Sequence, residues 1–215
     1  LLEASVVSGI TCIGVQTLQE VIHWLESKWS PHPIPSTKTT QHTSSFDMAE
    51  VKGHITPKRV LEIGFLWGHS TTYQLETYTD ADLVCIGPIE ENLGYEVPDP
   101  KLRYEQIDKM NKVYGSRFTH IKGKTQYVQN DMLENFTDWF DFALIDGYHK
   151  PWAVEFDSTM CQDLGIKACL IDNWDQKPVR HTVLKYTDYK PMQVFPYDQE
   201  WKGQMYRNEI ALCTL

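Results

Sequence analysis

Apolar and polar positions from residue 57 onward follow two alternating periods. Short apolar runs of strand length predict β-strands at 59–63, 82–86, 118–122, 140–145 and 167–171. Mixed segments with helical spacing lie after or between them and predict helices at about 69–77, 101–114, 152–163 and 178–186. The runs 140–145 and 167–171 are apolar almost throughout, which is typical of strands that are covered on both faces.

This alternation predicts an α/β fold in which right-handed crossovers connect parallel strands. Two further runs, 191–197 and 206–213, are joined by a polar segment and predict a long hairpin at the end of the chain. We therefore expect a Rossmann-like, doubly wound and mostly parallel seven-stranded sheet. Its last strand should be antiparallel, and helices should cover both faces.

The first 56 residues have a different character. Five apolar side chains at helical spacing predict a helix that ends at Ser30: Val15, Leu18, Ile22, Leu25 and Trp29. Three prolines (Pro31, Pro33 and Pro35) then stiffen a connector, and residues 36–47 are almost entirely polar. We expect 1–56 to be a helix and connector, which is either a lid over a site or an ordinary solvated loop, and 57–215 to be the main domain.

Composition and charge are those of a globular protein. Of 215 residues, 41% are hydrophobic and 23% are charged. The net charge of −9 and the pI of about 5.3 argue against a nucleic-acid or anionic-membrane surface. Residues 1–15 are too short and polar to span a bilayer and lack the basic flank of a signal peptide. We expect a cytoplasmic protein with no nucleic-acid or membrane partner, and a homo-oligomer stays open.

The cysteines favour a reducing compartment. They are odd in number, contain no C-x-x-C pair and mostly lie in apolar runs: Cys12, Cys85, Cys161, Cys169 and Cys213. This pattern predicts small buried thiols and argues against disulfides or a zinc site.

Residues 59–70 carry the most informative motif, Arg-Val-Leu-Glu-Ile-Gly-Phe-Leu-Trp-Gly-His-Ser. A buried strand reaches Glu62 and then turns sharply at Gly64 and Gly68 into a helix. Glycines let the backbone approach a ligand, and a helix start offers free N–H groups, which suits a nucleoside-bearing ligand at the carboxyl edge of a parallel sheet. The motif matches neither G-x-G-x-x-G nor a phosphate loop, so on its own it also fits a tight turn without a ligand.

Two later strands end in acids as well. The first is followed by Asp146-Gly-Tyr-His149 and the second by Asp172-Asn173-Trp174. Two carboxylates and an amide oxygen at one sheet edge would suit Mg²⁺, and His149 would be close enough to accept a proton. Each residue alone is ordinary turn or capping chemistry. Their joint occurrence at strand ends favours a functional site.

The chain resembles class I S-adenosylmethionine-dependent methyltransferases over about residues 57 to 213. It is most similar to the small metal-dependent O-methyltransferase branch with an Asp-Gly-x-His segment, which includes sugar and macrolide O-methyltransferases and cephalosporin-hydroxylase-like proteins. The segments Leu61–Thr71, Ile145–His149 and Ile171–Trp174 carry the resemblance. It implies S-adenosylmethionine as cofactor, Mg²⁺ or another divalent cation, and a small-molecule hydroxyl acceptor.

The resemblance also implies roles for individual residues. The implied cofactor-binding residues are Glu62, Gly64, Phe65, Gly68, Ser70, Glu90 and Asp146. The implied metal ligands are Asp146, Asp172 and Asn173, and His149 is the implied base, with Asp146 beside it. Aromatic side chains near the expected site either stack on the acceptor or serve in packing: Trp67, Tyr73, Tyr95, Tyr148, Trp152 and Trp174.

The sequence departs from this family at two places. Gly87 stands where members usually have an acid that binds the ribose, although Glu90 or Glu91 lies nearby. Lys124 stands where an acid usually approaches the adenine. Two charge-assisted hydrogen bonds, each worth roughly 1.5–3 kcal/mol, would be lost.

The second interpretation is therefore a non-catalytic or weakly cofactor-binding protein on a methyltransferase fold. A hydrolase or oxidoreductase is disfavoured, because neither G-x-S-x-G nor G-x-G-x-x-G occurs.

Overall fold

The computed structural model of the protein describes residues 43–44, 48–89, 99–201 and 204–215. The predicted helix at 15–29, the proline connector, and the residues Glu90, Glu91, Tyr95 and Cys12 lie outside these ranges. The chain divides into two compact units, 1–45 with 198–206, and 46–197 with 207–215. In the smaller unit, the short strand β1 (Thr43–Ser44) pairs antiparallel with residues 199 and 200 of β7.

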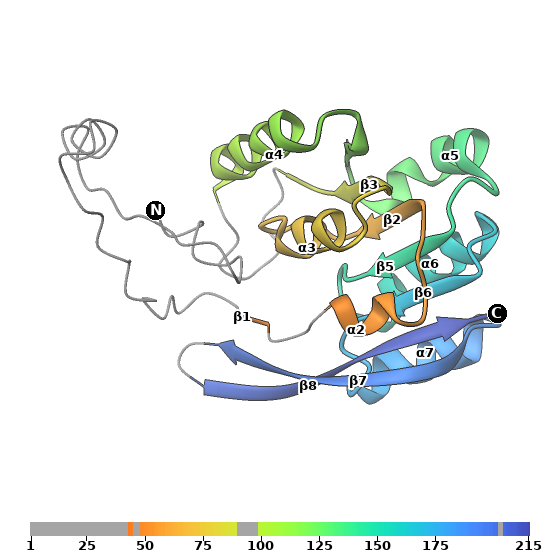
Figure 1. The fold of residues 1–215 in the computed structure, drawn as a ribbon. Helices are drawn as coiled ribbons and strands as arrows, with labels where there is room; N and C mark the ends of the chain where they lie inside the picture. The colour runs from red at the N-terminus through yellow and green to blue at the C-terminus, as the bar shows by residue number, and fades with distance from the viewer. Residues whose placement is uncertain (1–42, 45–47, 90–98, 202–203) are drawn as a thin grey trace. The chain divides into compact units, whose positions relative to one another are not determined.

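The larger unit is built on a sheet with the strand order β7-β8-β6-β5-β2-β3-β4 (Figure 1). The strands are β2 (Arg59–Ile63), β3 (Asp82–Gly87), β4 (Phe118–Lys122), β5 (Phe142–Ile145), β6 (Ala168–Ile171), β7 (Lys190–Trp201) and β8 (Gln204–Thr214). Strands β2 to β6 pair in parallel, and β8 is antiparallel to β6. This seven-stranded sheet confirms the predicted Rossmann-like architecture.

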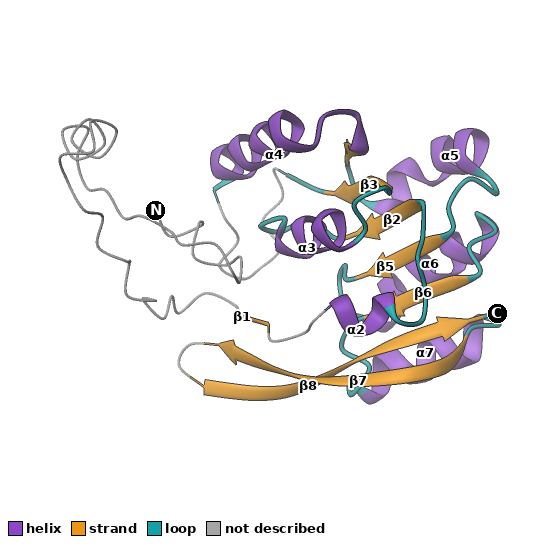
Figure 2. Cartoon of the chain, in the orientation of Figure 1, coloured by secondary structure: helices purple, strands orange, loops and turns teal. Residues whose placement is uncertain are grey.

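Helices cover both faces of this sheet (Figure 2). They are α2 (Met48–Lys52), α3 (His69–Thr77), α4 (Pro100–Tyr114), α5 (Thr125–Phe136), α6 (Pro151–Asp163) and α7 (Lys177–Tyr186), with a 3-10 turn at Gly115–Arg117. One hydrophobic cluster joins the sheet to α2, α3 and α4, and a second joins its other face to α5, α6 and α7. None of the helices described has the length and apolar character needed to cross a membrane.

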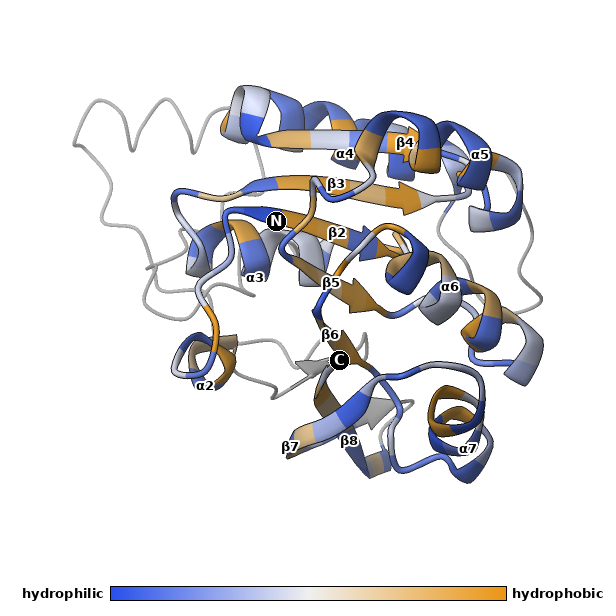
Figure 3. Cartoon of the chain, turned by 90° about the vertical axis from the view of Figure 1, so that its right-hand side faces the viewer, coloured by the Kyte–Doolittle hydropathy of each residue, from blue (hydrophilic) through white to orange (hydrophobic). Residues whose placement is uncertain are grey.

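Successive strand residues alternate between the two clusters, because side chains in a strand point to opposite faces. Val60 and Leu144 belong to the first cluster, whereas Leu61 and Ile145 belong to the second. Both sets are buried, which explains why the central strands are apolar along most of their length (Figure 3). The four cysteines that the structure describes are buried and free, as predicted.

Three details of the predicted elements were wrong. Helix α5 was missed, because it begins after Lys124 without a side-chain cap and so lacks a start signal. The hairpin strands are longer than predicted, and much of the expected connection is strand.

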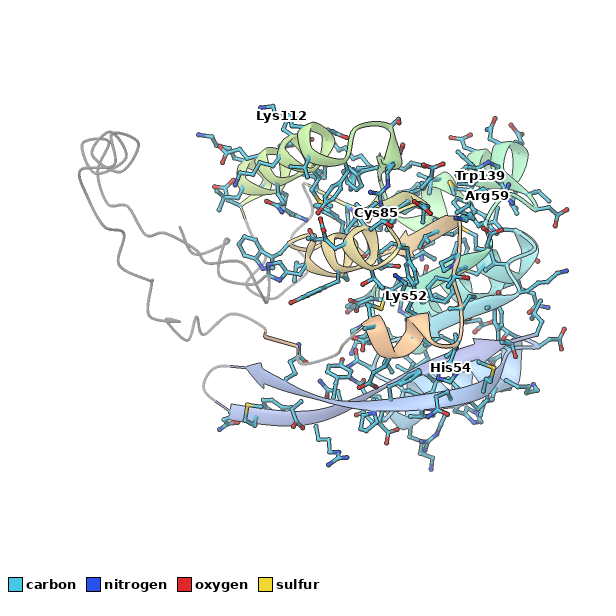
Figure 4. The ribbon with its side chains drawn as sticks, viewed as in Figure 1. Lys52, His54, Arg59, Cys85, Lys112 and Trp139 are labelled. Carbon is cyan, nitrogen blue, oxygen red and sulfur yellow. The ribbon has the colours of Figure 1, made fainter. Side chains whose placement is uncertain are left out.

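The third correction concerns β5, which begins at Phe142 rather than at 140. Asp141 is part of a corner instead. Its carboxylate accepts hydrogen bonds from the Lys58 and Arg59 amides at 2.9 and 3.0 Å. The Arg59 guanidinium lies 5.5 Å from the centroid of the Trp139 ring (Figure 4). These contacts join the amino-terminal ends of β2 and β5, at the edge of the sheet opposite the carboxyl ends of the strands.

Candidate functional site

The strand register places the predicted acids at one edge of the sheet. Ile63 pairs with Ile145, and Ile145 pairs with Ile171. The amide of Asp146 continues this pattern with a bond to the Ile63 carbonyl at 2.9 Å, and the amide of Asp172 bonds to the Ile145 carbonyl at 3.1 Å. Asp146 and Asp172 therefore leave neighbouring strands at the same level, at the carboxyl edge where ligands bind in open α/β folds.

The glycine turn after β2 packs directly against this edge. Gly64 has a φ of 115°, and a Cβ atom there would lie 2.0 Å from the Asp146 carbonyl oxygen. Gly68 has a φ of 71° and caps the start of α3. Both positions need glycine for backbone reasons alone. The spacing of Gly64 and Gly68, which suggested a ligand-binding loop, is therefore also explained by backbone conformation and packing.

Glu62 lies two residues deeper in the sheet than Asp146, because it is opposite Leu144 within the strand pair. Its side chain is fully buried, and the Ser70 hydroxyl donates a hydrogen bond to Oε1. Oε2 makes no hydrogen bond of normal geometry, although the Thr71 hydroxyl and the Cys85 thiol lie close. Burial raises the pKa of Glu62 to about 8, and these neighbours lower it only in part.

Asp146, His149 and Asp172 form a cluster at the carboxyl edge of the sheet, nearer the surface than Glu62. One ligand atom from each lies within 4.8 Å of the others. His149 Nε2 is 3.4 Å from Asp146 Oδ1, and each of these two side chains is 36% exposed. The Tyr197 hydroxyl donates a hydrogen bond of 2.6 Å to Asp172 Oδ1. The loops after β5 and β6 therefore bring together three of the predicted residues.

The cluster shifts the protonation equilibria of its members. Burial raises the pKa of Asp172, and the charge of Asp146 raises it further. Burial alone would lower the pKa of His149, but the hydrogen-bonding and charge effects of Asp146, with the charges of Asp172 and Asp157, raise it overall. His149 is consequently a stronger base than an isolated imidazole, because the neighbouring carboxylates stabilise its protonated form.

Asn173 directly follows Asp172 at this edge and is the third predicted oxygen donor. It has a left-handed φ of 54°, which asparagine tolerates better than most residues. It is 8% exposed, and its Oδ1 has no hydrogen-bond partner among the described residues. An unpartnered buried acceptor beside two carboxylates fits a hard divalent cation such as Mg²⁺.

Gly87 has a structural explanation. A Cβ atom at this position would lie 2.6 Å from Phe65 Cβ and 2.8 Å from the Phe65 backbone nitrogen. Phe65 itself is 4% exposed, and its ring packs edge-on against His120 at 5.0 Å. The glycine turn thus occupies the space that an acidic side chain at 87 would need, and Phe65 lies in the core.

Two residues of the site escaped the sequence analysis. Asp157 in α6 is 3% exposed and accepts a hydrogen bond of 2.6 Å from the Thr125 hydroxyl. Its signal was an acid at an apolar helical position, since Val154, Ser158 and Cys161 on the same helix are also buried. Tyr197 gave no such signal, because a tyrosine in a strand is common.

The aromatic residues divide into two groups. Tyr148 and Trp152 flank His149 and are 39% and 57% exposed, with ring centroids 5.9 Å apart. Trp174 is 3% exposed in the core, and Tyr73 of α3 packs against the core. The first pair offers an exposed aromatic surface beside His149, and Trp67 in the glycine turn is partly exposed.

Comparisons with known proteins bear on the fold. No family model matches the chain, and no curated protein matches its sequence. The O-methyltransferase from Bacillus cereus, solved with S-adenosylhomocysteine, is similar over 100% of both chains, with a TM-score of 0.57 and 14% identity. The O-methyltransferase TomG from Streptomyces achromogenes, which is involved in tomaymycin synthesis and was solved with S-adenosylmethionine, covers 97% of this chain and 93% of its own, with a TM-score of 0.54 and 13% identity.

A tRNA methyltransferase, TrmK from B. subtilis, has the same general fold. The similarity covers 80% of this chain but 66% of TrmK, just under two thirds, with a TM-score of 0.53 and 13% identity. At these identities the likeness establishes the fold alone. It is the Rossmann-like fold that these three methyltransferases share.

Proposed function

We propose that the protein is an S-adenosylmethionine-dependent O-methyltransferase that acts on a small hydroxylated molecule with the help of a divalent cation. The cluster of Asp146, His149 and Asp172 beside the glycine turn carries this proposal. This cluster would supply both a cation site and a base at the edge of the sheet where ligands bind in folds of this kind.

The residues at the glycine turn fit the cofactor. Glu62, Gly64, Gly68, Ser70 and Asp146 would hold its methionine and ribose end. The carboxyl group of Glu62 is buried, and its Oε2 lacks a hydrogen bond of normal geometry, so a polar group of the ligand could supply that bond. When bound, S-adenosylmethionine supplies a methyl group that is already activated by the sulfonium, so no covalent protein intermediate is needed.

The carboxylate cluster would bind the cation and remove the proton. Asp146, Asp172 and Asn173 would be its protein ligands, and the Tyr197 hydroxyl fixes the orientation of Asp172. A divalent cation at this site would lower the pKa of an acceptor hydroxyl. His149, with its raised pKa, would accept the proton of that hydroxyl.

The acceptor would meet Tyr148 and Trp152 first. Their exposed rings stand on either side of His149 in the sequence, at the start of α6. Aromatic faces pack well against planar or sugar rings. The proposed acceptor is accordingly a ring-bearing small molecule with a free hydroxyl group.

Gly87 and Phe65 favour one competing function, a protein of this fold that binds the cofactor weakly and does not turn over. The packing of Phe65 leaves no room for the acid that family members use at the end of β3. In that case, the cluster would bind a cation without methyl transfer.

Calorimetry and a chelator experiment distinguish these functions. We expect S-adenosylmethionine and S-adenosylhomocysteine to give measurable heats at micromolar to millimolar concentration. We also expect methyl transfer from labelled cofactor to ring-bearing hydroxyl compounds, abolished by EDTA and restored by Mg²⁺ or Mn²⁺. Heats without any transfer would favour the non-catalytic protein, and full activity in EDTA would remove the cation from the proposal.

A further inference from the structure

Asp157 is a charged group in an apolar environment. It lies on the inner face of α6, next to the cluster that contains Val154 and Cys161. Burying a carboxyl group is costly unless specific partners hold it. Its burial raises the pKa of Asp157 to about 6. Such a residue in the middle of a core helix calls for a role that an apolar side chain would not provide.

Its contacts join two loops at the carboxyl edge of the sheet. Oδ1 accepts the 2.6 Å hydrogen bond from Thr125, which is 5% exposed and begins α5 directly after the loop that leaves β4. Oδ2 faces the other loop, because a Cβ atom at Gly147 would lie only 2.9 Å from it. Gly147 is the residue that follows Asp146 in the loop that carries His149.

We propose that Asp157 is a positioning residue that ties the β4–α5 loop to the β5–α6 loop and thereby holds Asp146 and His149 in place. The carboxylate packs against the peptide between these two side chains and is anchored on its other side by Thr125. The separation of 3.4 Å between His149 Nε2 and Asp146 Oδ1 depends on the path of this short loop. Only the kinetic part of the test rests on the proposed methyl transfer.

Hydrogen exchange tests the link without any activity. The amides of Asp146 and Lys150 are bonded to the Ile63 and Tyr148 carbonyls, both at 2.9 Å, and report on the loop. We expect Thr125→Val to speed exchange at these amides about tenfold or more and Thr125→Ser to restore protection. Thr182→Val, at a buried threonine of α7, is the matched control and should leave these amides unchanged.

Kinetics then show whether the link serves catalysis. Thr125→Val and Asp157→Ala should each lower kcat about tenfold or more, with KM for the acceptor changed less than threefold. Asp157→Asn keeps an oxygen for Thr125 and should stay within threefold of the natural protein. The double variant should be no worse than either single variant, because both remove the same link.

Two results separate the possible failures. Unchanged exchange and unchanged kcat in Thr125→Val would overturn the positioning role while leaving the methyltransferase proposal intact. Faster exchange in Thr125→Val, together with no methyl transfer by the natural protein, would support the link and overturn the proposed function.

Discussion

Glu62 and the pair formed by Asp146 and Asp172 are all acids at the ends of parallel strands, but they have opposite environments. Glu62 is the fourth residue of a five-residue strand and is fully buried beneath α3, with Ser70 as hydrogen-bond donor. Asp146 and Asp172 follow the last residues of their strands and are partly exposed beside His149. All three carboxyl groups lie towards the same edge of the sheet, but Glu62 is buried within it and the two aspartates lie at its surface.

A difference of two residues in register accounts for this contrast. An acid within the strand points into the layer between sheet and helix, where burial favours the neutral form. An acid just after the strand lies on the rim of the sheet, here called the crest and formed by Asp146, His149 and Asp172, where water, a cation or a histidine can reach it. The position of an acid relative to the last strand residue is therefore a better guide to its chemistry than its presence at a strand end.

The largest effect that tests this contrast is expected on the crest. Asp172→Ala removes one of two carboxylates in the proposed cation site, and loss of several kcal/mol of transition-state stabilisation would slow the proposed methyl transfer roughly 100-fold or more. Thermal stability should fall as well, by up to the roughly 1.5–3 kcal/mol of a hydrogen bond to a charged group, because Asp172→Ala also removes the acceptor of the bond from Tyr197. Single-turnover methyl transfer at saturating cofactor measures the effect.

Asp163→Ala at the exposed end of α6 is the matched control and should retain full activity. Equal activity of Asp172→Ala and the natural protein would show that the crest has no catalytic function.

Glu62 should instead control stability and its dependence on pH. Its pKa is about 8 in the folded protein against an ordinary value of 4.5, so the folded state holds a proton that the unfolded state has lost over this range. Stability contributed by Glu62 is therefore complete below pH 4.5 and falls as pH rises towards 8. Between pH 5 and pH 8 this loss amounts to about 3.5 kcal/mol.

Glu62→Gln should remove that loss. Urea unfolding at pH 5 and pH 8 is expected to show the variant gaining stability relative to the natural protein as pH rises, whereas Glu134→Gln on the exposed face of α5 should show no such gain. A difference that does not vary with pH would mean that Glu62 is charged in the folded protein.

The contrast also shows what sequence could predict. The order of the strands and of helices α3, α4, α6 and α7, and the meeting of Asp146 with Asp172, followed from apolar runs and the rule that parallel strands share a carboxyl edge. The depth of Glu62 did not, because register between strands is set by three-dimensional pairing.

The contacts of Asp157 with Thr125 and of Tyr197 with Asp172 also lay beyond the sequence, since they join residues 32 and 25 positions apart. Gly87 is the clearest case. Its meaning depends on Phe65, which contacts it only because the glycine turn folds back over β3.

The smallest expected effect on activity comes from removing the hydrogen bond that Tyr197 in β7 donates to Asp172. Tyr197→Phe removes the hydroxyl that donates to Asp172 Oδ1 while keeping the ring, which is 7% exposed. Losing one hydrogen bond to a charged group costs about 1.5–3 kcal/mol at most, and a misaligned ligand lowers activity roughly tenfold. Tyr127→Phe, at a ring that is 76% exposed on α5, should change neither quantity. If Tyr197→Phe lowers stability but not methyl transfer, Tyr197 supports the fold alone, and the crest orients its carboxylates without help from the neighbouring strand.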